Sequence, residues 1–444
     1  MLELDSDRAL LVDLYELTMA AAYFEQHVDC RATFELFVRQ LPPERAYLVA
    51  GGIEDAVDYL AALRFTREHV NFVRSLPVFR NVSSEFFEYL SEFRFAGDVE
   101  AVEEGTLIFA EEPLLQVTAP ILEAQIVETY LLSITNFETL VASKAARVVR
   151  AARGRGVLEF GTRRAQGPEA GVRAARAAYL GGCVATSNVL AGFRYGIPLA
   201  GTAAHSWTQA FPTERQSFEA LLDTFPEDAI LLVDTYDPIA GAETAATLGR
   251  KIAGVRIDSG DLLATSRRVR EILDRHGLRE AKIVASGDLN EYKVEALLSQ
   301  GAPIDLFGVG TDLATSRDVP ALSVVYKLVE IEHNGQVDYK SKFSEEKVYS
   351  PGRKQVFRFS AGAHYHHDLI TRSREEPSEG TPLLHPVMRH GRRLRSRPCL
   401  QDARTNVLAN LDRLPEPYHA LRNAPGYPVA KSEALQRLLE EVRE

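Results

Sequence analysis

FGTRRAQGPEAGVRAARAAYLGGCVATSNVLAGFRYGIPLAGTAAH, residues Phe160–His205, is the stretch that decides the fold of this 444-residue chain. The apolar segment VLEF, which ends at Phe160, and the segment PLAG, near the other end of the stretch, are typical of buried strands. Polar residues or glycines follow each of them, and the run Pro168–Leu180 between them predicts a helix. Because folds with parallel strands place their chemistry where the strands end, we expect functional residues at both ends of this stretch.

The same alternation of strand and helix continues beyond this stretch. Each strand candidate runs into a polar or glycine-rich end, namely GTRR, GTAAH, DTYD, DSGD, SGDL and GVGTD. Loops after strands are polar in many proteins without a function, but such an end on every candidate favours a shared site at the C-terminal rim of a barrel. The candidates are Val157–Phe160, Ile197–Ala200, Ile230–Val233, Gly254–Ile257, Lys282–Ala285 and Asp305–Val309.

The segments on either side of these βα repeats have a different character. The first third mixes helices and strands, and the alternating patterns after Leu322 predict antiparallel strands. A last amphipathic helix is expected at 431–444, with Ser432 as its N-cap. In the first third we expect helices at 7–26, 53–63 and 83–93 and strands at 32–39, 99–102 and 106–110, followed by a helical pattern at 121–149.

Composition limits the class of protein. The chain has 51 Lys+Arg and 62 Asp+Glu, and the formal net charge of -11 argues against a protein that binds nucleic acid along its surface. The three cysteines are far apart and form no ligand or disulfide pattern, so a reducing cytoplasm is the expected compartment. We expect no signal peptide and no membrane span, because the first residues are acidic and no apolar run reaches bilayer length.

Three glycine-rich turns are candidates for phosphate binding. SGDL occurs at Ser259–Leu262 and again at Ser286–Leu289, and GVGT occurs at Gly308–Thr311. Glycine lets backbone N–H groups approach an anion, and the N-terminus of a following helix adds its dipole. Any one such turn is more often a tight turn without a ligand, but three on successive strands suggest a phosphate-rich ligand.

Several aspartates lie at the same predicted strand ends. Carboxylates beside phosphate-binding turns hold Mg²⁺ or ribose hydroxyls, but aspartate at such positions also caps helices. We expect Asp261 to be a cap, and Asp234 or Asp258 to bind metal or ribose. The full set is Asp234, Asp237, Asp258, Asp261 and Asp288.

The remaining candidates suit a phosphoryl group and a planar, anionic substrate. His205 follows a predicted strand in the same layer as the acids, which favours a general base or phosphoryl acceptor over a structural histidine. Arg163 and Arg164 follow Phe160, and a guanidinium beside an aromatic ring suits a flat ligand with a carboxylate. Tyr15 is either a second stacking partner or, on its sequence alone, a core aromatic.

Two further features carry less weight. The histidines of AHYHHD, which are His364, His366 and His367, suit a metal site, but a solvated loop is the favoured interpretation. The basic run Arg389–Arg397 suits phosphate or RNA, but it has no interleaved aromatic residues and the chain is acidic overall. We therefore expect that run to be a surface patch.

Taken together, these residues resemble the nicotinate phosphoribosyltransferase family, a type II phosphoribosyltransferase family. The most specific matches are FGTRRAQG, GTAAHS and VRIDSGDL, and the matching segments occur in family order over most of the chain. One departure is Thr162, where the family often has an apolar residue. The matching segments are Val12–Ala20, Phe160–Gly171, Ala185–Gly192, Gly201–Ser206, Val255–Leu262, Phe307–Leu313 and Gly352–Arg358.

The resemblance implies an α/β fold with an irregular α/β barrel at 119–321. A second, sandwich-like α/β domain is implied for 1–118 together with 322–400, followed by a helical tail at 401–444. The implied reaction joins nicotinate to 5-phosphoribosyl 1-diphosphate, giving nicotinate mononucleotide and diphosphate, with coupled hydrolysis of ATP and a requirement for Mg²⁺. This is the salvage entry to NAD. A homodimer with shared active sites is also implied, with no nucleic acid or membrane as a partner.

The resemblance also assigns roles to individual residues. His205 matches the histidine that ATP phosphorylates, and Asp234 and Asp258 are expected to hold Mg²⁺ and ribose. The nicotinate pocket is expected to consist of Tyr15, Phe160, Arg163, Thr202 and Arg256. The phosphate-binding set is expected to consist of Ser259, Gly260, Gly287, Asp288, Gly308, Gly310 and Thr311, with Arg39, Arg353 and Lys354 as a clamp for the leaving diphosphate.

Two alternatives remain at this point. A related pyridine phosphoribosyltransferase, acting on nicotinamide or quinolinate, would share the phosphate machinery and differ in the ring pocket. Quinolinate carries two carboxylates and would require more basic residues around the ring. A non-catalytic regulator that binds nucleotide would show degraded motifs, whereas His205, Arg163, Asp258 and the GVGT turn are all present.

Overall fold

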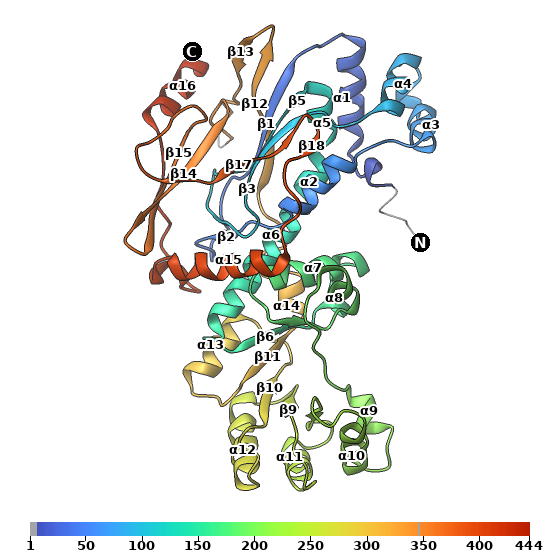
Figure 1. The fold of residues 1–444 in the computed structure, drawn as a ribbon, viewed down its shortest axis with the longest axis vertical. Coiled ribbons are helices and arrows are strands. Elements are labelled where there is room, and N and C mark those ends of the chain that lie inside the picture. The colour runs from blue at the N-terminus through green and yellow to red at the C-terminus, as the bar shows by residue number, and fades with distance from the viewer. Residues whose placement is uncertain (1–6, 345–346) are drawn as a thin grey trace. The chain divides into compact units, whose positions relative to one another are not determined.

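The structure is a computed structural model that describes residues 7–344 and 347–444 (Figure 1). The chain divides into two compact units, the first formed by Met1–Leu140 and Ala321–Glu444 and the second by Val141–Pro320. The first boundary differs from the expected 118/119 because one long helix, α6 (Glu128–Ala151), runs through it. Residues 401–444 belong to the first unit and do not form a separate tail.

The second unit is built on a parallel sheet with the strand order β7-β6-β11-β10-β9-β8. The strands β6 to β11 are arranged around the barrel in the same order as in the chain. The last strand, β11, pairs with the first, β6. A single bridge, Thr186 to Leu199, brings the next segment beside β7, and among the described residues no pairing joins this segment to β8. The predicted α/β fold with an irregular barrel is therefore confirmed. The strands are β6 (Gly156–Glu159), β7 (Ala185–Thr186), β8 (Ile230–Leu232), β9 (Gly254–Ile257), β10 (Lys282–Ala285) and β11 (Leu306–Val309).

The strand expected at Ile197–Ala200 forms only this bridge. Pro198 has no N–H to donate to a ladder, and Leu199 is 53% exposed, so the segment lies at the edge of the open seam. The predicted helix Pro168–Leu180 is observed as α7, and it begins with Pro168 at its first turn. The other helices of this unit are α8 (Val189–Tyr195), α9 (His205–Gln209), α10 (Glu214–Thr224), α11 (Pro238–Ala246), α12 (Leu262–Arg275), α13 (Glu291–Ser299) and α14 (Thr311–Ala314).

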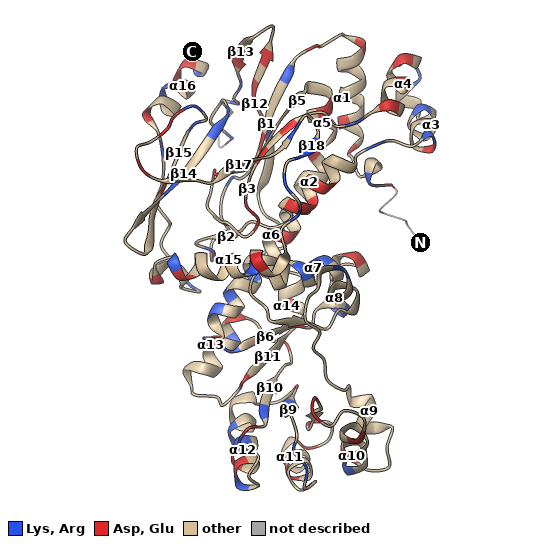
Figure 2. Cartoon of the chain, viewed as in Figure 1, with Lys and Arg blue, Asp and Glu red and all other residues tan. Residues whose placement is uncertain are grey.

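Helix α12 shows why these segments fold as a shell around the barrel. Val269, Ile272 and Leu273 lie on one face of the helix and are fully buried, while charged residues of both signs surround them from Arg267 to Arg275 (Figure 2). The carboxylate of Asp261 accepts hydrogen bonds from the backbone N–H groups of Leu263 and Ala264, at 3.1 and 3.0 Å, so the predicted helix cap is confirmed.

The first unit contains an antiparallel sheet in the order β13-β12-β1-β5-β3-β17-β18. Strand β12, from the chain after the barrel, pairs along the whole of β1, which explains why the unit is discontinuous. Leu36, Val117 and Leu60 contribute to a single large core between this sheet and its helices. The strands are β1 (Arg31–Val38), β3 (Asp98–Val102), β5 (Pro113–Pro120), β12 (Val324–His333), β13 (Gln336–Tyr339), β17 (Leu384–Arg389) and β18 (Arg392–Arg393), and the helices are α1 (Leu14–Glu25), α2 (Ile53–Ala62), α3 (Arg67–Ser75), α4 (Ser84–Glu92) and α5 (Ile121–Ile126).

A smaller sheet completes the first unit in the order β16-β14-β15-β19. The AHYHHD segment lies in β15, so the expectation of a loop there is wrong. The predicted last helix is observed, and Ser432 caps it by accepting a hydrogen bond from the N–H of Leu435 at 3.1 Å. The elements are β14 (Lys354–Ala361), β15 (His364–Arg372), β16 (Thr381–Pro382), β19 (Val429–Lys431), α15 (Leu400–Arg413) and α16 (Glu433–Arg443). The short strands β2 (Leu48–Val49) and β4 (Leu107–Ile108) pair in a separate two-stranded sheet. None of the helices in the described residues is long and apolar enough to cross a bilayer.

Candidate active site

The predicted site residues of the second unit meet at one edge of its parallel sheet. Phe160 follows β6, Asp234 follows β8, and Asp258 follows β9. Gly287 and Thr311 follow β10 and β11. Since the strands are parallel, these ends share the C-terminal rim, as in other barrels of this type (Figure 1). Thr202 and His205 belong to the segment at the open seam and at the start of α9.

Arg256, on β9, is the centre of the rim. Its Nε donates a hydrogen bond to Ser286 Oγ at 2.7 Å, and its Nη1 donates to Thr202 Oγ1 at 2.8 Å. Its Nη2 lies 2.6 Å from Asp258 Oδ1 in an ion pair. The guanidinium carbon lies 6.0 Å from the centroid of the Phe160 ring. The Arg256 side chain thus contacts Asp258 and the hydroxyl groups of Ser286 and Thr202, and it lies near the Phe160 ring. Thr202 and Arg256, which were both expected in the nicotinate pocket, are therefore in contact.

Two glycines of the predicted phosphate turns are needed for close packing at the rim. A Cβ atom at Gly308 would lie 2.7 Å from two carbons of the Phe160 ring, so only glycine lets this ring lie against β11. Gly287 has φ +98°, and a Cβ atom there would lie 2.0 Å from the backbone oxygen of Asp258. The turns therefore have a steric requirement for glycine apart from any ligand.

Asp234 and Asp258 form an acidic pair with different surroundings. Asp234 Oδ2 accepts hydrogen bonds from Asp258 N–H at 2.8 Å and from Ser259 Oγ at 2.7 Å. Its other oxygen, Oδ1, is buried and has no hydrogen-bond partner among the described residues. Burial alone would raise the pKa of Asp258, but the hydrogen bond from Ser286 and the charge of Arg256 outweigh it and hold that pKa below its usual value.

His205 lies beside this acidic pair. Its Nδ1 is 3.2 Å from Thr235 Oγ1, and its Nε2 is 3.8 Å from Asp258 Oδ2. The side chain of His205 is 41% exposed, so a reagent from solvent can reach the ring. The predicted meeting of His205 with Asp258 is therefore observed, whereas Thr235 was not predicted.

The acidic pair is the best place in this unit for a divalent cation. The described residues contain no group of three or more His, Cys, Asp or Glu side chains that could hold a metal ion without further ligands. Mg²⁺ is commonly bound by one or two protein carboxylates, with phosphate oxygens and water as its other ligands. The buried, unpartnered Oδ1 of Asp234 is the kind of oxygen that such an ion would satisfy.

The turn that carries Arg163 is fixed from below by a buried acid. Both arginines of this turn, Thr162–Arg164, are exposed. Glu159 Oε2 accepts a hydrogen bond from Thr186 Oγ1 at 2.6 Å, and Glu159 Oε1 accepts one from the backbone N–H of Gly161. Asn188 Nδ2 donates to Thr162 Oγ1 at 3.0 Å. Sequence reasoning missed Glu159, although a charged residue within the otherwise apolar predicted strand Val157–Phe160 was a signal.

A second network that sequence reasoning missed supports the phosphate turns. Asn290 Nδ2 donates a hydrogen bond to Asp312 Oδ2 at 2.9 Å, which joins the turn after β10 to the turn after β11. Behind them Lys144 Nζ lies 2.7 Å from Glu291 Oε2 and 2.8 Å from Asp318 Oδ1. Lys144 and Glu291 are almost completely buried, so α6 holds both turns through charged groups that are removed from water.

The other predicted site residues lie in the first unit. Tyr15 is 46% exposed on α1, and burial together with the charge of Glu128 raises its pKa. Arg39 is half-buried after β1, and Arg353 Nη2 lies 3.3 Å from Glu100 Oε1. The prediction for Lys354 does not fit this structure.

Lys354 lies in the core of the first unit. Its side chain is 3% exposed, and its Nζ lies 2.8 Å from Glu35 Oε2 and donates to the backbone oxygen of Gly352 at 2.7 Å. The ammonium group is thus buried and already paired, which corrects the expectation that it helps to clamp a diphosphate.

Comparison with known proteins covers nearly the whole chain. Family models described as the nicotinate phosphoribosyltransferase N-terminal domain, family and C-terminal domain match residues 10–136, 156–351 and 376–439. The chain is 45% identical to nicotinate phosphoribosyltransferase pncB2 of Mycobacterium tuberculosis, over 96% of this chain and 92% of that protein. It is 38% identical to the nicotinate phosphoribosyltransferase of Bacillus subtilis, over 97% and 94% of the two chains.

Solved structures agree with these sequence matches. The crystal structure of human nicotinic acid phosphoribosyltransferase superposes with a TM-score of 0.85 at 29% identity, covering 97% of this chain and 99% of that chain. That of nicotinate-nucleotide pyrophosphorylase from Pyrococcus furiosus superposes with a TM-score of 0.76 at 25% identity, covering 93% and 97%.

Proposed function

The chain belongs to the nicotinate phosphoribosyltransferase family, and we propose that it transfers the 5-phosphoribosyl group of phosphoribosyl diphosphate to nicotinate. The products are nicotinate mononucleotide and diphosphate, and the reaction serves NAD salvage. The finer part of the proposal is that ATP hydrolysis drives it through a phosphorylated His205. A cytoplasmic location belongs to the same proposal and is supported by three cysteines that form no disulfide in the described structure.

The observation that carries the proposal is the environment of Arg256. The contacts of its guanidinium with Thr202 and Asp258, and its position near the Phe160 ring, define a place where a flat anionic ring meets positive charge. Arg163, exposed at the end of the same turn as Phe160, would supply a second guanidinium for the nicotinate carboxylate. A neutral nicotinamide would leave that charge unused, which favours nicotinate over its amide.

The chemical step suits the rest of the rim. The pyridine nitrogen would form a bond to the ribose carbon while the bond from that carbon to the diphosphate breaks, and positive charge develops on the sugar. The turns at Gly287–Asp288 and Gly308–Thr311, with Ser259 and Gly260, would bind the 5-phosphate and hold the ribose in place. Asp234 and Asp258 would hold Mg²⁺, whose charge would offset that of the leaving diphosphate. Arg39 and Arg353 remain the proposed clamp residues.

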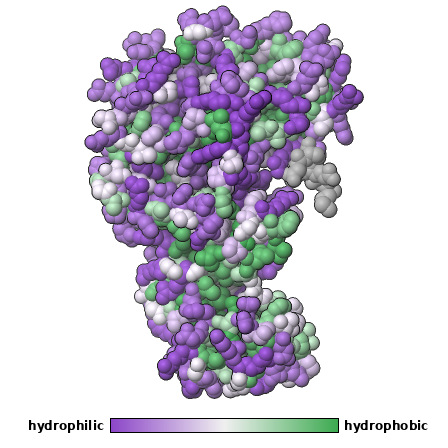
Figure 3. Space-filling model, in the orientation of Figure 1, coloured by the Kyte–Doolittle hydropathy of each residue, from purple (hydrophilic) through white to green (hydrophobic). Residues whose placement is uncertain are grey.

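An apolar surface supports a second copy of the chain as the partner. Helix α8 exposes Val189 by 70% and Phe193 by 86%, and apolar surface is visible where this helix lies (Figure 3). Leu11 and Leu14, close to Tyr15 in sequence, are also more than 40% exposed. Exposed apolar patches of this kind mark protein interfaces. A homodimer in which Tyr15 completes the site of the partner is therefore part of the proposal.

The test is a direct assay of nicotinate, phosphoribosyl diphosphate and ATP, with quinolinate and nicotinamide as competing pyridines. Wild type should form nicotinate mononucleotide and, with γ-labelled ATP, carry an acid-labile label that His205→Ala lacks. If the label persists in His205→Ala, another residue is the phosphoryl acceptor. If quinolinate is turned over faster than nicotinate, quinolinate is the substrate. Mixing Tyr15→Ala with His205→Ala chains should restore activity in mixed dimers if Tyr15 acts across the interface.

A further inference from the structure

A cavity in the first unit is lined by none of the residues assigned to the catalytic site. Its volume is about 200 Å³, and it opens among β14, β15, the start of β16 and the end of α15. Its polar lining includes Arg358, Tyr365, His385, Asn410, Arg413 and Ser360. We call it the Arg413 cavity.

Two guanidinium groups pack against one aromatic ring in this cavity. The guanidinium carbon of Arg358 lies 4.9 Å from the centroid of Tyr365, and that of Arg413 lies 4.5 Å from it. Tyr365 is itself fixed, because its hydroxyl donates to Asn410 Oδ1 at 2.6 Å. Arg358 and Tyr365 are buried and Arg413 is exposed, so one cation belongs to the interior of the cavity and one to its rim.

Several hydrogen-bond donors of the cavity are left without partners. Arg358 donates through Nε and Nη2 to Asp368 and through Nη2 to the oxygen of Leu107, whereas its Nη1 has no partner among the described residues. Within the part of the chain that the structure describes, Arg413 donates only to Ser360 Oγ, at 3.0 Å. The lining thus offers donors from both arginines and the Asn410 amide, and a ligand that fits must be rich in acceptors.

The charges around the cavity also favour an anion. Asp368 neutralises Arg358, with a bond of 2.6 Å between Nη2 and Oδ2. Burial raises the pKa of the nearby Glu112 carboxyl well above its usual value, so this group keeps its proton to a higher pH than an exposed glutamate does. Glu103, which also lines the Arg413 cavity, forms an ion pair with Arg395 at 2.9 Å. Arg413 has no acidic partner in the described residues, so its charge remains uncompensated.

We propose that the Arg413 cavity is a second, non-catalytic binding site for a phosphate group, either free or carried by a small sugar. A phosphate dianion between two guanidiniums makes charge-assisted hydrogen bonds of the strongest kind found in proteins. A cavity of about 200 Å³ leaves room for atoms beyond the phosphate itself. Bound phosphate would join α15, through Arg413 and Asn410, to β14, through Arg358 and Ser360.

The test compares wild type with Arg413→Gln by calorimetric titration at constant ionic strength. The probes are inorganic phosphate and ribose 5-phosphate, which differ only in the presence of the sugar. The catalytic site is expected to bind both probes as well, so the readout is the difference between the two proteins. Wild type should show one additional site for at least one probe, and Arg413→Gln should weaken that site about 10- to 100-fold. Hydrogen exchange should show phosphate-dependent protection of α15 and β14 in wild type alone.

A matched variant separates this site from general loss of charge. Arg443, an exposed residue of α16, lies outside the cavity, so Arg443→Gln should bind both probes like wild type. Identical titrations of wild type and Arg413→Gln with both probes would overturn the proposal, as would an equal loss in Arg443→Gln. Failure of the pyridine assay would remove the proposed function without affecting this difference, so the two proposals fail separately.

Discussion

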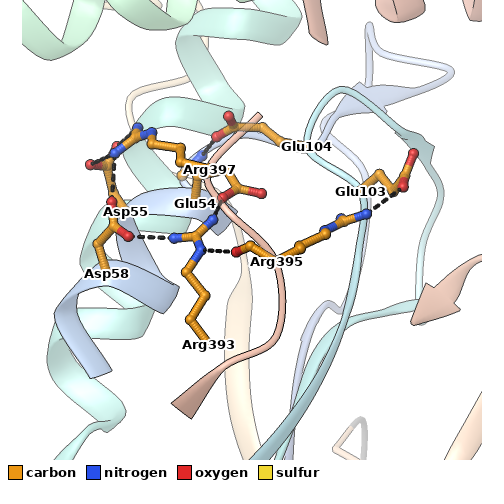
Figure 4. A network of polar contacts seen from close by, with 9 residues as sticks. Glu54, Asp55, Asp58, Glu103, Glu104, Arg393, Arg395 and Arg397 are labelled. Carbon is orange, nitrogen blue, oxygen red and sulfur yellow. Dashed lines mark hydrogen bonds and ion pairs between the residues drawn. The ribbon is translucent and has the colours of Figure 1, made fainter. Parts of the chain in front are cut away.

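The chain uses arginine in opposite ways in a strap of the first unit and at the rim of the second. In the strap, Arg389–Arg397, Arg393 contacts both Glu54 and Asp58, Arg397 contacts Asp55 and Asp58, and Arg395 contacts Glu103 (Figure 4). At the rim, Arg256 has one carboxylate partner, and its other bonds go to hydroxyl groups and to a backbone oxygen. In the strap, Arg393, Arg395 and Arg397 are each paired with carboxylates. At the rim, most hydrogen bonds of Arg256 go to neutral groups.

This difference separates a structural network of ion pairs from a candidate binding site. The run Arg389–Arg397 lies at the surface as expected, with Arg392 and Arg395 exposed, but its ion pairs were not predicted because the acids of α2 lie far from it in sequence. At the rim, Asp234 Oδ1 is buried with no hydrogen-bond partner in residues 7–344 and 347–444, and Arg163 is exposed. Buried polar groups are rarely left unsatisfied unless function requires it. Variants of the rim should therefore affect activity, and variants of the strap should affect stability.

The largest effect on activity is expected from Asp234→Asn. The asparagine oxygen can still accept from Asp258 N–H and Ser259 Oγ, while the negative charge that a cation needs is lost. We expect kcat/KM to fall on the order of 100- to 1,000-fold, with a higher Mg²⁺ requirement, because a charged group at the reacting centre is removed. The free energy of unfolding should stay near the wild-type value, since both accepted hydrogen bonds are kept and the amide NH₂ takes the place of the unpartnered oxygen.

Asp261→Asn is the matched control at the same rim. Asp261 caps α12, and asparagine is an equally good cap, so activity and stability should both stay near wild type. Mg²⁺ titration of the activity and urea unfolding measure the two quantities. If Asp234→Asn were as active as this control, the unpartnered oxygen of Asp234 would have no role in catalysis.

Arg163→Ala should give the next largest effect. A charge-assisted hydrogen bond to a carboxylate is worth about 1.5–3 kcal/mol, so the KM for nicotinate should rise on the order of 10- to 150-fold. Nicotinamide lacks the charge and should lose much less. Arg164→Ala provides the control, because Arg164 is exposed in the same turn. An equal rise in KM for both pyridines, measured by steady-state kinetics, would show that Arg163 does not bind the nicotinate carboxylate.

Much of the barrel could be predicted because each strand leaves a local signal. An apolar run followed by glycine or a polar residue marks β6, β8, β9, β10 and β11 to within one or two residues. Strand β7 was missed because two residues carry no periodicity, and the exposed Leu199 segment was assigned to a strand although it has only a bridge. Helix α3 was also missed in the first unit.

The site could be predicted only as far as strand ends determine it. The meeting of Asp234, Asp258 and His205 follows from parallel strands that end at one edge. The contacts of Ser286 and Thr235 depend on side-chain directions that a pattern of residue types does not contain. Lys354 shows the same limit, because its partner Glu35 comes from another sheet of the first unit. Long-range ion pairs of this kind have no local signature.

Arg393→Met tests the strap and should leave catalysis unchanged. The side chain is 17% exposed and contacts Glu54, which is 4% exposed, so the change leaves a nearly buried carboxylate without its cation. We expect the free energy of unfolding to fall by about 1–3 kcal/mol, with kcat/KM at the wild-type value. Arg392→Met, at the exposed neighbouring residue, should change stability by less than about 0.5 kcal/mol. A loss of activity in the folded Arg393 variant would contradict the division between the two regions.

The smallest effect is expected for Glu159→Gln, which tests a residue intermediate between the two regions. Glu159 is buried at the end of β6, and both its oxygens accept hydrogen bonds, but no cation neutralises it in the described structure. Burial raises the pKa of Glu159, and the hydrogen bonds from Thr186 and Gly161 oppose this only in part. The folded protein therefore keeps this proton to a higher pH than the unfolded chain does.

The sign of the pH effect follows from that difference. Below the unfolded pKa of about 4.3 both states are protonated, and wild type and Glu159→Gln should have similar stability. As the pH rises through the folded pKa, wild type loses stability because the buried carboxyl must ionise, whereas the glutamine does not titrate. The stability of the variant relative to wild type should therefore increase with pH, as urea unfolding at pH 4, 6 and 8 would measure, with the exposed Glu227→Gln as a control for loss of one charge. A constant or shrinking difference would show that Glu159 is ionised and stabilised by its hydrogen bonds. It would then resemble the paired acids of the strap more than the residues of the rim.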